Sequence, residues 1–284
     1  MSRPSVERTS RSPAAEVAAT WMRFWFTPAD PRPLAIVRIL AALLGLALLW
    51  SYAGDLLVWF GPRGMIPVEA AAASRPRFGV SLFDLTVTDW AVWGAFAATG
   101  AAFVLLLTGV ATTVVAVLAA GLWASLMHRG PMLAGPADDC LAVLLWCVAI
   151  GGGGAAGPAL RPRIAAGLMQ LHASAIATAG LLSQLKGDAW WDGTAAWWLA
   201  ARPDSRILDL TGAYAASEYL VNLVTHGITA FEAVFAVGLW FSATQQPLAR
   251  AGLVAWPLIG ILAGEPLWGC ALAIFCVPLA AGDP

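Results

Sequence analysis

A single amine stands at the end of an apolar segment of this sequence. Lys186, in SQLKGDAWWDGTAAWW, is the only lysine of the 284-residue chain, and all the other Lys/Arg positions are arginine. A lysine at the edge of an apolar segment can act as a general base when its surroundings lower its pKa. The same position suits a side chain that extends its ammonium group to lipid headgroups. Lys186 is therefore a candidate catalytic residue with a structural alternative.

Two further candidates lie in a later apolar segment. Asn222 and His226 are four residues apart, and Glu232 lies deeper in the segment. On a helix, a step of four residues places side chains on one face. A carboxyl group near the middle of a bilayer needs a cation or a proton. We therefore expect either a structural ion pair between Arg38 and Glu232, or proton handling by Glu232 or His226.

A polar stripe marks the segment that precedes Lys186. Its members share one face of a helix with 3.6 residues per turn: Gln170, Ser174, Thr178 and Gln184. Such side chains either hydrogen-bond to a neighbouring helix or line a pocket. In the second case we expect a polar cavity on the outer side of the membrane, with these further members: Trp190, Asn222, Asp138 and Arg129. For Asp138, which opens a predicted helix, capping of exposed N–H groups is the alternative.

The composition places these residues in a membrane. Hydrophobic residues make up 60% of the chain and charged residues only 12%, and the mean hydropathy is +0.74. Soluble proteins contain about 25% charged residues, so a soluble fold could not cover this much apolar surface. The net charge of −1 argues against a nucleic-acid partner, which requires a basic face. No pair of cysteines has C-x-x-C spacing, and we expect no metal site.

The hydropathy pattern predicts an all-α integral membrane bundle. A span needs about 20 apolar residues, which gives about eight spans with interfacial helices in the outward loops. The predicted spans are residues 34–52, 90–108, 110–127, 140–157, 164–185, 220–241, 248–263 and 267–281. Residues 1–33 form a predicted cytoplasmic tail, and residues 34–284 a single transmembrane domain. Arginines near the span ends place the N-terminus on the cytoplasmic side of the cell membrane.

The segment around Lys186 resembles the signature helix of the HTTM (horizontally transferred transmembrane) family. That signature has a glutamine, an apolar run, Ala-Gly and then K-L-x-G-x-x-W-x-x-G-x-A. The matching positions are Gln170, Ala179, Gly180, Leu185, Gly187, Trp190, Gly193 and Ala195. Three other segments resemble the family in the same order: FTPADPRPLAIVRIL, HRGPMLAGPADD and HGITAFE. The likeness covers nearly the whole chain.

The resemblance implies a fold and a set of activities. The family includes vitamin K-dependent gamma-carboxylases, in which a lysine acts as base on a reduced quinone. It also includes compact bacterial membrane proteins required for maturing a sporulation-delaying toxin. In this chain Gln184 occupies the place of the motif's lysine, and an amide cannot act as a base. We therefore do not expect an authentic carboxylase.

Three functions remain open from the sequence. The first is an accessory factor in the maturation, modification or export of a small peptide. The second is a quinone- or lipid-dependent membrane enzyme related to gamma-glutamyl carboxylase, in which Lys186 or His226 replaces the usual base. The third is a membrane binding protein without catalysis. The expected partners are membrane lipids and a small peptide substrate, and a quinone would be the cofactor of the second function.

Overall fold

Helices of very different lengths make up the computed structural model, which describes residues 12–75, 79–152, 157–203 and 206–282. Within these ranges there is no β-strand, only an isolated antiparallel bridge between Ala29 and Ala159. The long helices are α2 (Arg32–Ala53), α5 (Asp89–Thr108), α6 (Thr112–Arg129), α7 (Pro136–Gly151), α8 (Leu160–Gln184), α12 (Glu218–Gly238), α13 (Ser242–Ala263) and α14 (Pro266–Ala281). The short ones are α1 (Pro13–Phe26), α3 (Leu56–Phe60), α4 (Val68–Ser74), η1 (Leu82–Asp84), α9 (Asp188–Trp191), α10 (Ala195–Ala201) and α11 (Thr211–Ala216).

The long helices follow the predicted spans in order, and the all-helical fold class is confirmed. Six of those described are long and apolar enough to cross a membrane: α2, α5, α6, α8, α12 and α13. The other two, α7 and α14, have 16 residues each, or about 24 Å of helix against a hydrocarbon core of about 30 Å. The predicted count of about eight spans therefore depends on two short helices. The predicted span 140–157 also begins too late, because α7 starts at Pro136 and ends at Gly151.

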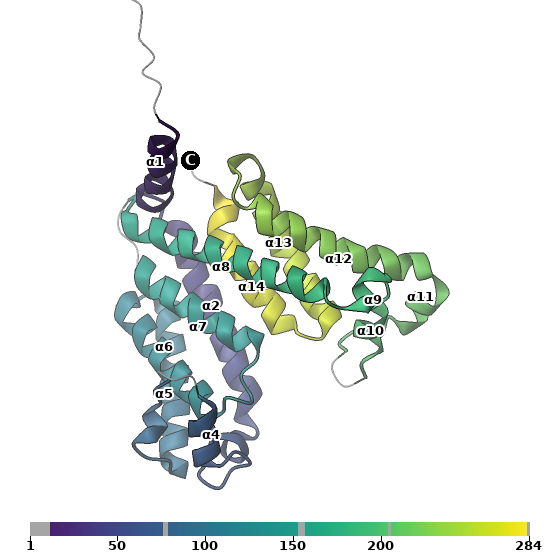
Figure 1. Cartoon of the computed structure of the whole chain (residues 1–284). Helices are drawn as coiled ribbons and strands as arrows, with labels where there is room; N and C mark the ends of the chain where they lie inside the picture. Colours follow the sequence, from purple (N-terminus) through teal and green to yellow (C-terminus); the bar gives the residue numbers. More distant parts are fainter. Residues whose placement is uncertain (1–11, 76–78, 153–156, 204–205, 283–284) are drawn as a thin grey trace, which may run out of the picture.

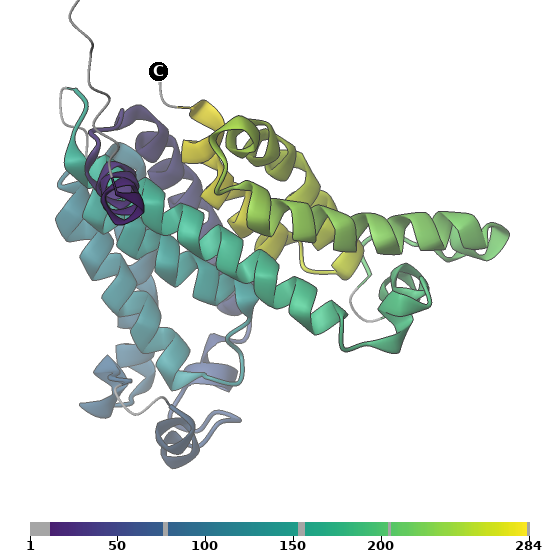
Figure 2. The ribbon, with the colours of Figure 1, turned by 45° about the horizontal axis from the view of Figure 1, so that its top comes forward.

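Two groups of helices meet along α8 and α14, since α14 packs against α2 and α7 as well as against α8 (Figure 1). Helices α2, α5, α6 and α7 pack together on one side, and α12, α13 and α14 lie on the other, where α13 and α14 form a hairpin. Helix α8 contacts α7 in the first group and both α12 and α14 in the second. Helices α8 and α12 extend side by side away from the first group, and the short helices α9, α10 and α11 lie at their far end (Figure 2).

The ends of the long helices have recognisable local causes. Helix α5 begins after Thr88, whose side chain accepts a hydrogen bond from the Ala91 N–H at 3.3 Å. It ends at Gly109, which has a left-handed φ of 80° that glycine adopts without strain. Helix α12 begins after Ser217, whose side chain accepts from the Leu220 N–H at 3.3 Å. Ser and Thr caps of this kind satisfy N–H groups that have no partner within the helix.

The described part of the predicted cytoplasmic tail contains a helix. Residues 13–26 form helix α1, which begins after Ser12 with Pro13 in its first turn. Proline is favoured there because its fixed φ suits the helix and no N–H is lost. Sequence reasoning missed this helix because its apolar residues are too few to form a span. Residues 1–11 lie outside the described residues.

A close contact between α2 and α5 gives the first prediction. An added Cβ at Gly45 would lie 2.6 Å from the ring of Phe103, which is fully buried. We expect Gly45→Ala to destabilise the bundle by about 1–3 kcal/mol, because overpacking forces side chains and backbone to shift. Gly94→Ala, on the open side of α5 with nothing within 4 Å, is the matched control and should stabilise slightly. Unfolding of the purified protein in mixed micelles measures both, and equal effects would contradict the contact.

Candidate functional site

The polar stripe of α8 is a hydrogen-bonded seam against the turn between α12 and α13. Gln170 is buried, and its Nε2 donates to the Leu239 carbonyl at 2.8 Å. Its Oε1 accepts from Gln245 Nε2 at 2.9 Å. Ser174 is buried one turn further on, where its hydroxyl donates to the Ala236 carbonyl at 2.6 Å. These bonds join α8 to backbone carbonyls that are not otherwise bonded at the end of α12, as expected for packed helices in lipid.

The far end of the seam contains a buried carboxyl group. Glu232 is 3% exposed, and its Oε2 accepts from Gln184 Nε2 at 2.9 Å. The other end of the same amide, Gln184 Oε1, accepts from the Thr229 hydroxyl at 2.8 Å. An added Cβ at Gly180 would lie 2.9 Å from Glu232 Oε2, so the absence of a side chain there makes room for the carboxyl group. We call Gln184, Thr229 and Glu232 the amide–carboxyl cluster.

The expected ion pair between Arg38 and Glu232 is not formed. The Arg38 guanidinium packs against Gly109, at the turn between α5 and α6, and its Nε is buried without a hydrogen-bond partner. The carboxyl group of Glu232 lies instead against α8, where the amide of Gln184 is its hydrogen-bond donor. The two side chains belong to different parts of the bundle, so the prediction is wrong.

The other predicted members at the far end are less enclosed. Lys186 lies beyond the last residue of α8, and its side chain is exposed. His226 is also exposed, although its Nε2 lies close to Gly193. Asn222 donates to the Glu218 carbonyl of its own helix at 3.0 Å, and Trp190 packs half-buried against the main core. Neither candidate base belongs to the amide–carboxyl cluster.

Thr178 is the one stripe residue that does not join two helices. Its hydroxyl donates to the Ser174 carbonyl of α8 itself at 2.7 Å, and the residue is exposed. The stripe was predicted either to form interhelical hydrogen bonds or to line a pocket. For Gln170, Ser174 and Gln184 the structure shows interhelical bonds, and for Gln170 it shows both.

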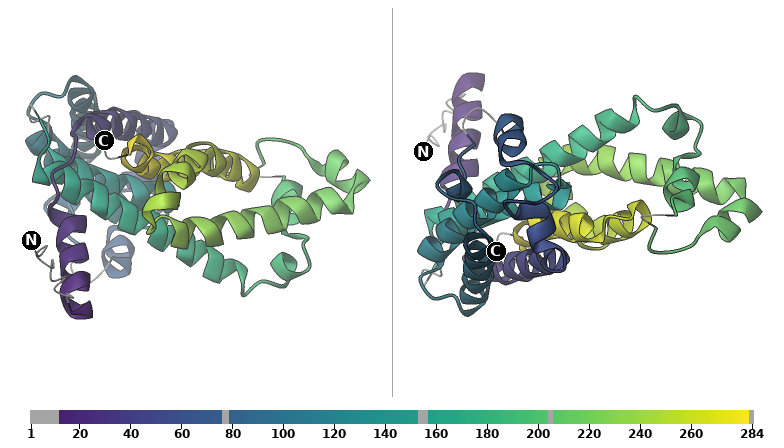
Figure 3. Two further views of the ribbon diagram at one scale, coloured as in Figure 1. Left: turned by 90° about the horizontal axis from the view of Figure 1, so that it is seen from above. Right: turned by 90° about the horizontal axis from the view of Figure 1, so that it is seen from below.

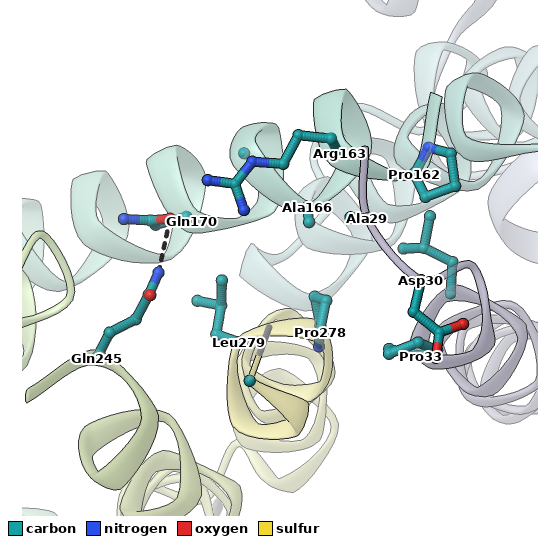
Figure 4. A pocket seen from close by; sticks show the side chains of 13 residues that line it. Ala29, Asp30, Pro33, Pro162, Arg163, Ala166, Gln170, Gln245, Pro278 and Leu279 are labelled. Carbon is teal, nitrogen blue, oxygen red and sulfur yellow. Dashed lines mark hydrogen bonds between the residues drawn. The ribbon is translucent and has the colours of Figure 1, made fainter. Parts of the chain in front are cut away.

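A pocket lies at the end of the seam near the start of α8 (Figure 4). It is small, with a cavity volume of about 40 Å³, and it opens in part to the surface. Gln170 and Gln245 close one side, and the Arg163 side chain extends along α8 toward Gln170. Asp30, Pro33 and Pro278 line the opposite side. This pocket is at the other end of α8 from Lys186, not on the side where the sequence placed a cavity.

Asp138 and Arg129 belong to a separate cluster. Arg129 is 2% exposed and donates to the Ile66 carbonyl at 3.0 Å and to the Gly61 carbonyl at 2.6 Å. Asp138 accepts from the Gly135 N–H at 2.7 Å, which is the capping contact expected as its alternative. It also accepts from the Tyr52 hydroxyl at 3.0 Å. Both residues therefore stabilise the structure around them through hydrogen bonds.

The expected single outer cavity therefore divides into two places. Arg129 binds the loop that precedes α4. Figures 1 and 3 show that α4 is well separated from α9 to α11, which lie at the far end of α8. The residues of the two places share no hydrogen bond in the described part of the chain. The 128–139 segment secures the loop between α3 and α4 and does not extend the seam.

The segment before α5 is attached by an ion pair that gives an acid-dependent prediction. Arg75 donates to both carboxylate oxygens of Asp84, at 2.8 and 2.6 Å. This bond, with that from the Ser81 N–H, lowers the pKa of Asp84 from its ordinary value of 3.8 to about 2. Because the folded pKa is the lower one, the stabilisation is complete above about pH 4 and is lost as the pH falls toward 2.

Limited proteolysis with pepsin measures this dependence at Leu82 and Leu85. At pH 4 we expect the wild-type segment to resist cleavage and the Asp84→Asn variant to be cut. As the pH falls toward 2 the two proteins should become alike. A wild-type segment that is equally sensitive at both pH values would show that the ion pair does not hold it.

The sequence analysis did not identify three residues that form hydrogen bonds with the predicted site residues. Thr229 lies three residues before Glu232, and this spacing places both on one helix face, so a signal was present. Gln245 lies in the first turns of α13, and nothing in the sequence links it to Gln170. Tyr52, at the end of α2, has no local pattern that predicts its bond to Asp138.

Comparisons with known proteins found no match to this chain. No protein-family model matches the sequence, no curated protein matches it, and no solved structure matches its fold.

Proposed function

We propose that the chain crosses the cell membrane about eight times, with its N-terminus in the cytoplasm. The end of α14 lies at the same end of the bundle as α1 in Figure 1, as an even number of crossings requires. Arg161 and Arg250 lie at this end, where Arg161 donates to the Thr113 hydroxyl at 3.0 Å and Arg250 to the Ala280 carbonyl at 3.3 Å. Basic residues at one end support a cytoplasmic assignment. In this arrangement α7 and α14 also cross, as short helices inside the bundle.

We further propose that the protein is an HTTM-like accessory factor in the maturation, modification or export of a small peptide. The observation that carries this proposal is the state of Gln184, at the place of the motif's lysine. Its amide is engaged at both ends, by Glu232 and Thr229, and an amide supplies no base. The cluster joins α8 to α12 and leaves no titratable nitrogen at that place.

The quinone- or lipid-dependent enzyme is the alternative that this geometry favours less. It needs a base close to a bound cofactor, and its candidates are Lys186 and His226, both of which are exposed. A general base has to lie within hydrogen-bond reach of the proton it removes, in a site that excludes water. A membrane-embedded protein that positions a peptide or another membrane component needs no such base.

Deletion of the gene in the organism that encodes the chain tests the proposal. The small-peptide fraction of membranes and culture medium would be compared by mass spectrometry before and after deletion, and after complementation. We expect a mature short peptide to disappear and its unprocessed or retained form to accumulate. A change confined to quinones or lipids would favour the enzyme, and an unchanged peptide profile would contradict the accessory role.

A further inference from the structure

Helix α1 has two chemically distinct faces. Val17, Trp21 and Met22 lie on one side and are 70%, 61% and 54% exposed. Glu16 and Arg23 lie on the opposite side. The polar side is internally bonded through Thr20, whose hydroxyl donates to the Glu16 carbonyl at 2.9 Å and accepts from Arg23 Nη2 at 3.1 Å. This 14-residue helix therefore exposes three large apolar side chains, a surface that suits contact with another apolar surface.

The contacts that attach α1 to the described bundle lie in its last turn. Trp25 and Phe24 pack on Gly167 of α8, where an added Cβ would meet their rings at 3.1 and 3.4 Å. The Phe24 carbonyl accepts from Arg163 Nε at 2.6 Å. Beyond this attachment α1 runs crosswise to α8 and extends past the edge of the bundle (Figure 3). Its apolar face therefore meets none of the described helices along most of its length.

Other aromatic side chains lie at the same level as α1. Trp240 is 46% exposed and Phe241 60% exposed at the turn between α12 and α13. The rings of Trp240 and Phe24 lie 5.7 Å apart, so this turn adjoins the attached end of α1. Tryptophan is enriched where a membrane protein crosses the headgroup region. These residues identify the level of a bilayer interface independently of α1.

The charge near α1 favours an anionic lipid surface as the occupant. Residues 1–33 contain five arginines and three acidic residues, a difference of plus two. Arg161 and Arg250 add to the positive charge at this end of the bundle. Amphipathic helices with tryptophan on one face and arginine on the other lie in the plane of the interface, and anionic lipids strengthen their binding.

We propose that α1 is an interfacial anchor that inserts Val17, Trp21 and Met22 into the headgroup and upper acyl region of an anionic leaflet. Helix α1 and the Trp240–Phe241 turn then fix the depth and tilt of α8 and α12, whose seam begins at this level. The proposal needs neither the peptide nor the quinone function, because it rests on the exposed face of α1, the Trp240–Phe241 turn and the arginines at that end of the bundle.

Site-specific fluorescence in the full chain tests the anchor. Val17→Cys, and Glu16→Cys from the opposite side of the helix, each in a Cys270→Ala background, would carry an environment-sensitive NBD group. The three other cysteines are buried and would be checked for labelling in the background variant. In vesicles of phosphatidylcholine with phosphatidylglycerol, we expect the residue 17 label to emit at shorter wavelength than the residue 16 label. It should also be quenched more by a nitroxide near the headgroup than by one at the chain end.

Four outcomes would overturn the proposal. Equal, water-like emission from both labels would show that the face is not inserted. Stronger quenching from the chain end would show that α1 is deeply buried in the bilayer. A shifted residue 17 label that no lipid nitroxide quenches would show that another copy of the chain covers it. Quenching that is unchanged in pure phosphatidylcholine would contradict the anionic surface.

Discussion

Gln184→Leu is expected to lower the free energy of unfolding by about 2–3 kcal/mol. The change removes the donor to Glu232 and the acceptor of Thr229. A buried polar group that loses its partner costs about 1–3 kcal/mol, and a carboxyl group lies at the upper end of that range. Chemical unfolding in mixed micelles, followed by tryptophan fluorescence, measures the loss.

Two further variants make the prediction specific to the amide–carboxyl cluster. Thr178→Ala changes a polar residue of the same stripe that is exposed and bonds only within α8, and it should have little effect. The double variant Gln184→Leu/Glu232→Leu should regain part of the loss, because both buried partners are then apolar. If Gln184→Leu is no more destabilising than Thr178→Ala, the cluster does not stabilise the bundle.

Arg129→Met should destabilise the protein by about 3 kcal/mol and expose the loop between α3 and α4. Methionine fills a similar volume but leaves the Gly61 and Ile66 carbonyls without their charged donor. Hydrogen bonds to charged groups contribute about 1.5–3 kcal/mol, and here two are lost together. The unfolding free energy and the protease sensitivity of residues 61–67 report the two effects.

Arg63→Met is the matched control for this prediction. Arg63 lies in the same loop, but its side chain is 88% exposed and its contact with Asp89 is 3.6 Å long. Surface ion pairs of this kind contribute little. A loop that opens equally in both variants would show that general charge, and not the buried guanidinium of Arg129, holds it closed.

The long helices could be predicted from the sequence because bilayer-length apolar runs have few alternative structures. The beginning of α2 at Arg32 and the end of α5 at Thr108 lie within two residues of the predicted spans. Helix α1 could not be found in this way, since its apolar residues form one face and not a continuous run. The predicted span 140–157 begins four residues after the start of α7 because the polar Asp138 does not extend an apolar run, although it is favoured, like Pro136, in a first helical turn.

The stripe on α8 could be predicted, whereas its partners could not. Helical spacing alone places Gln170, Ser174 and Gln184 on one face. Which group faces Glu232 depends on the packing of α8 against α12, and the sequence offered Arg38 because a cation is the usual partner of a buried carboxylate. In the structure Gly180 leaves space for Glu232 beside Gln184. A small residue on one helix can mark the place where a polar side chain of another helix packs. This can be recognised only when it is known which helices pack together.

The central claim is that the protein acts without a catalytic base at Lys186 or His226. The most direct test is the double variant Lys186→Gln/His226→Gln, expressed in the deletion strain at the wild-type membrane level. Its readout is the peptide product that disappears on deletion. We predict that the variant restores this product to the wild-type amount. Loss of the product, with the variant protein present and folded, would contradict the claim and assign a catalytic base to one of these two residues.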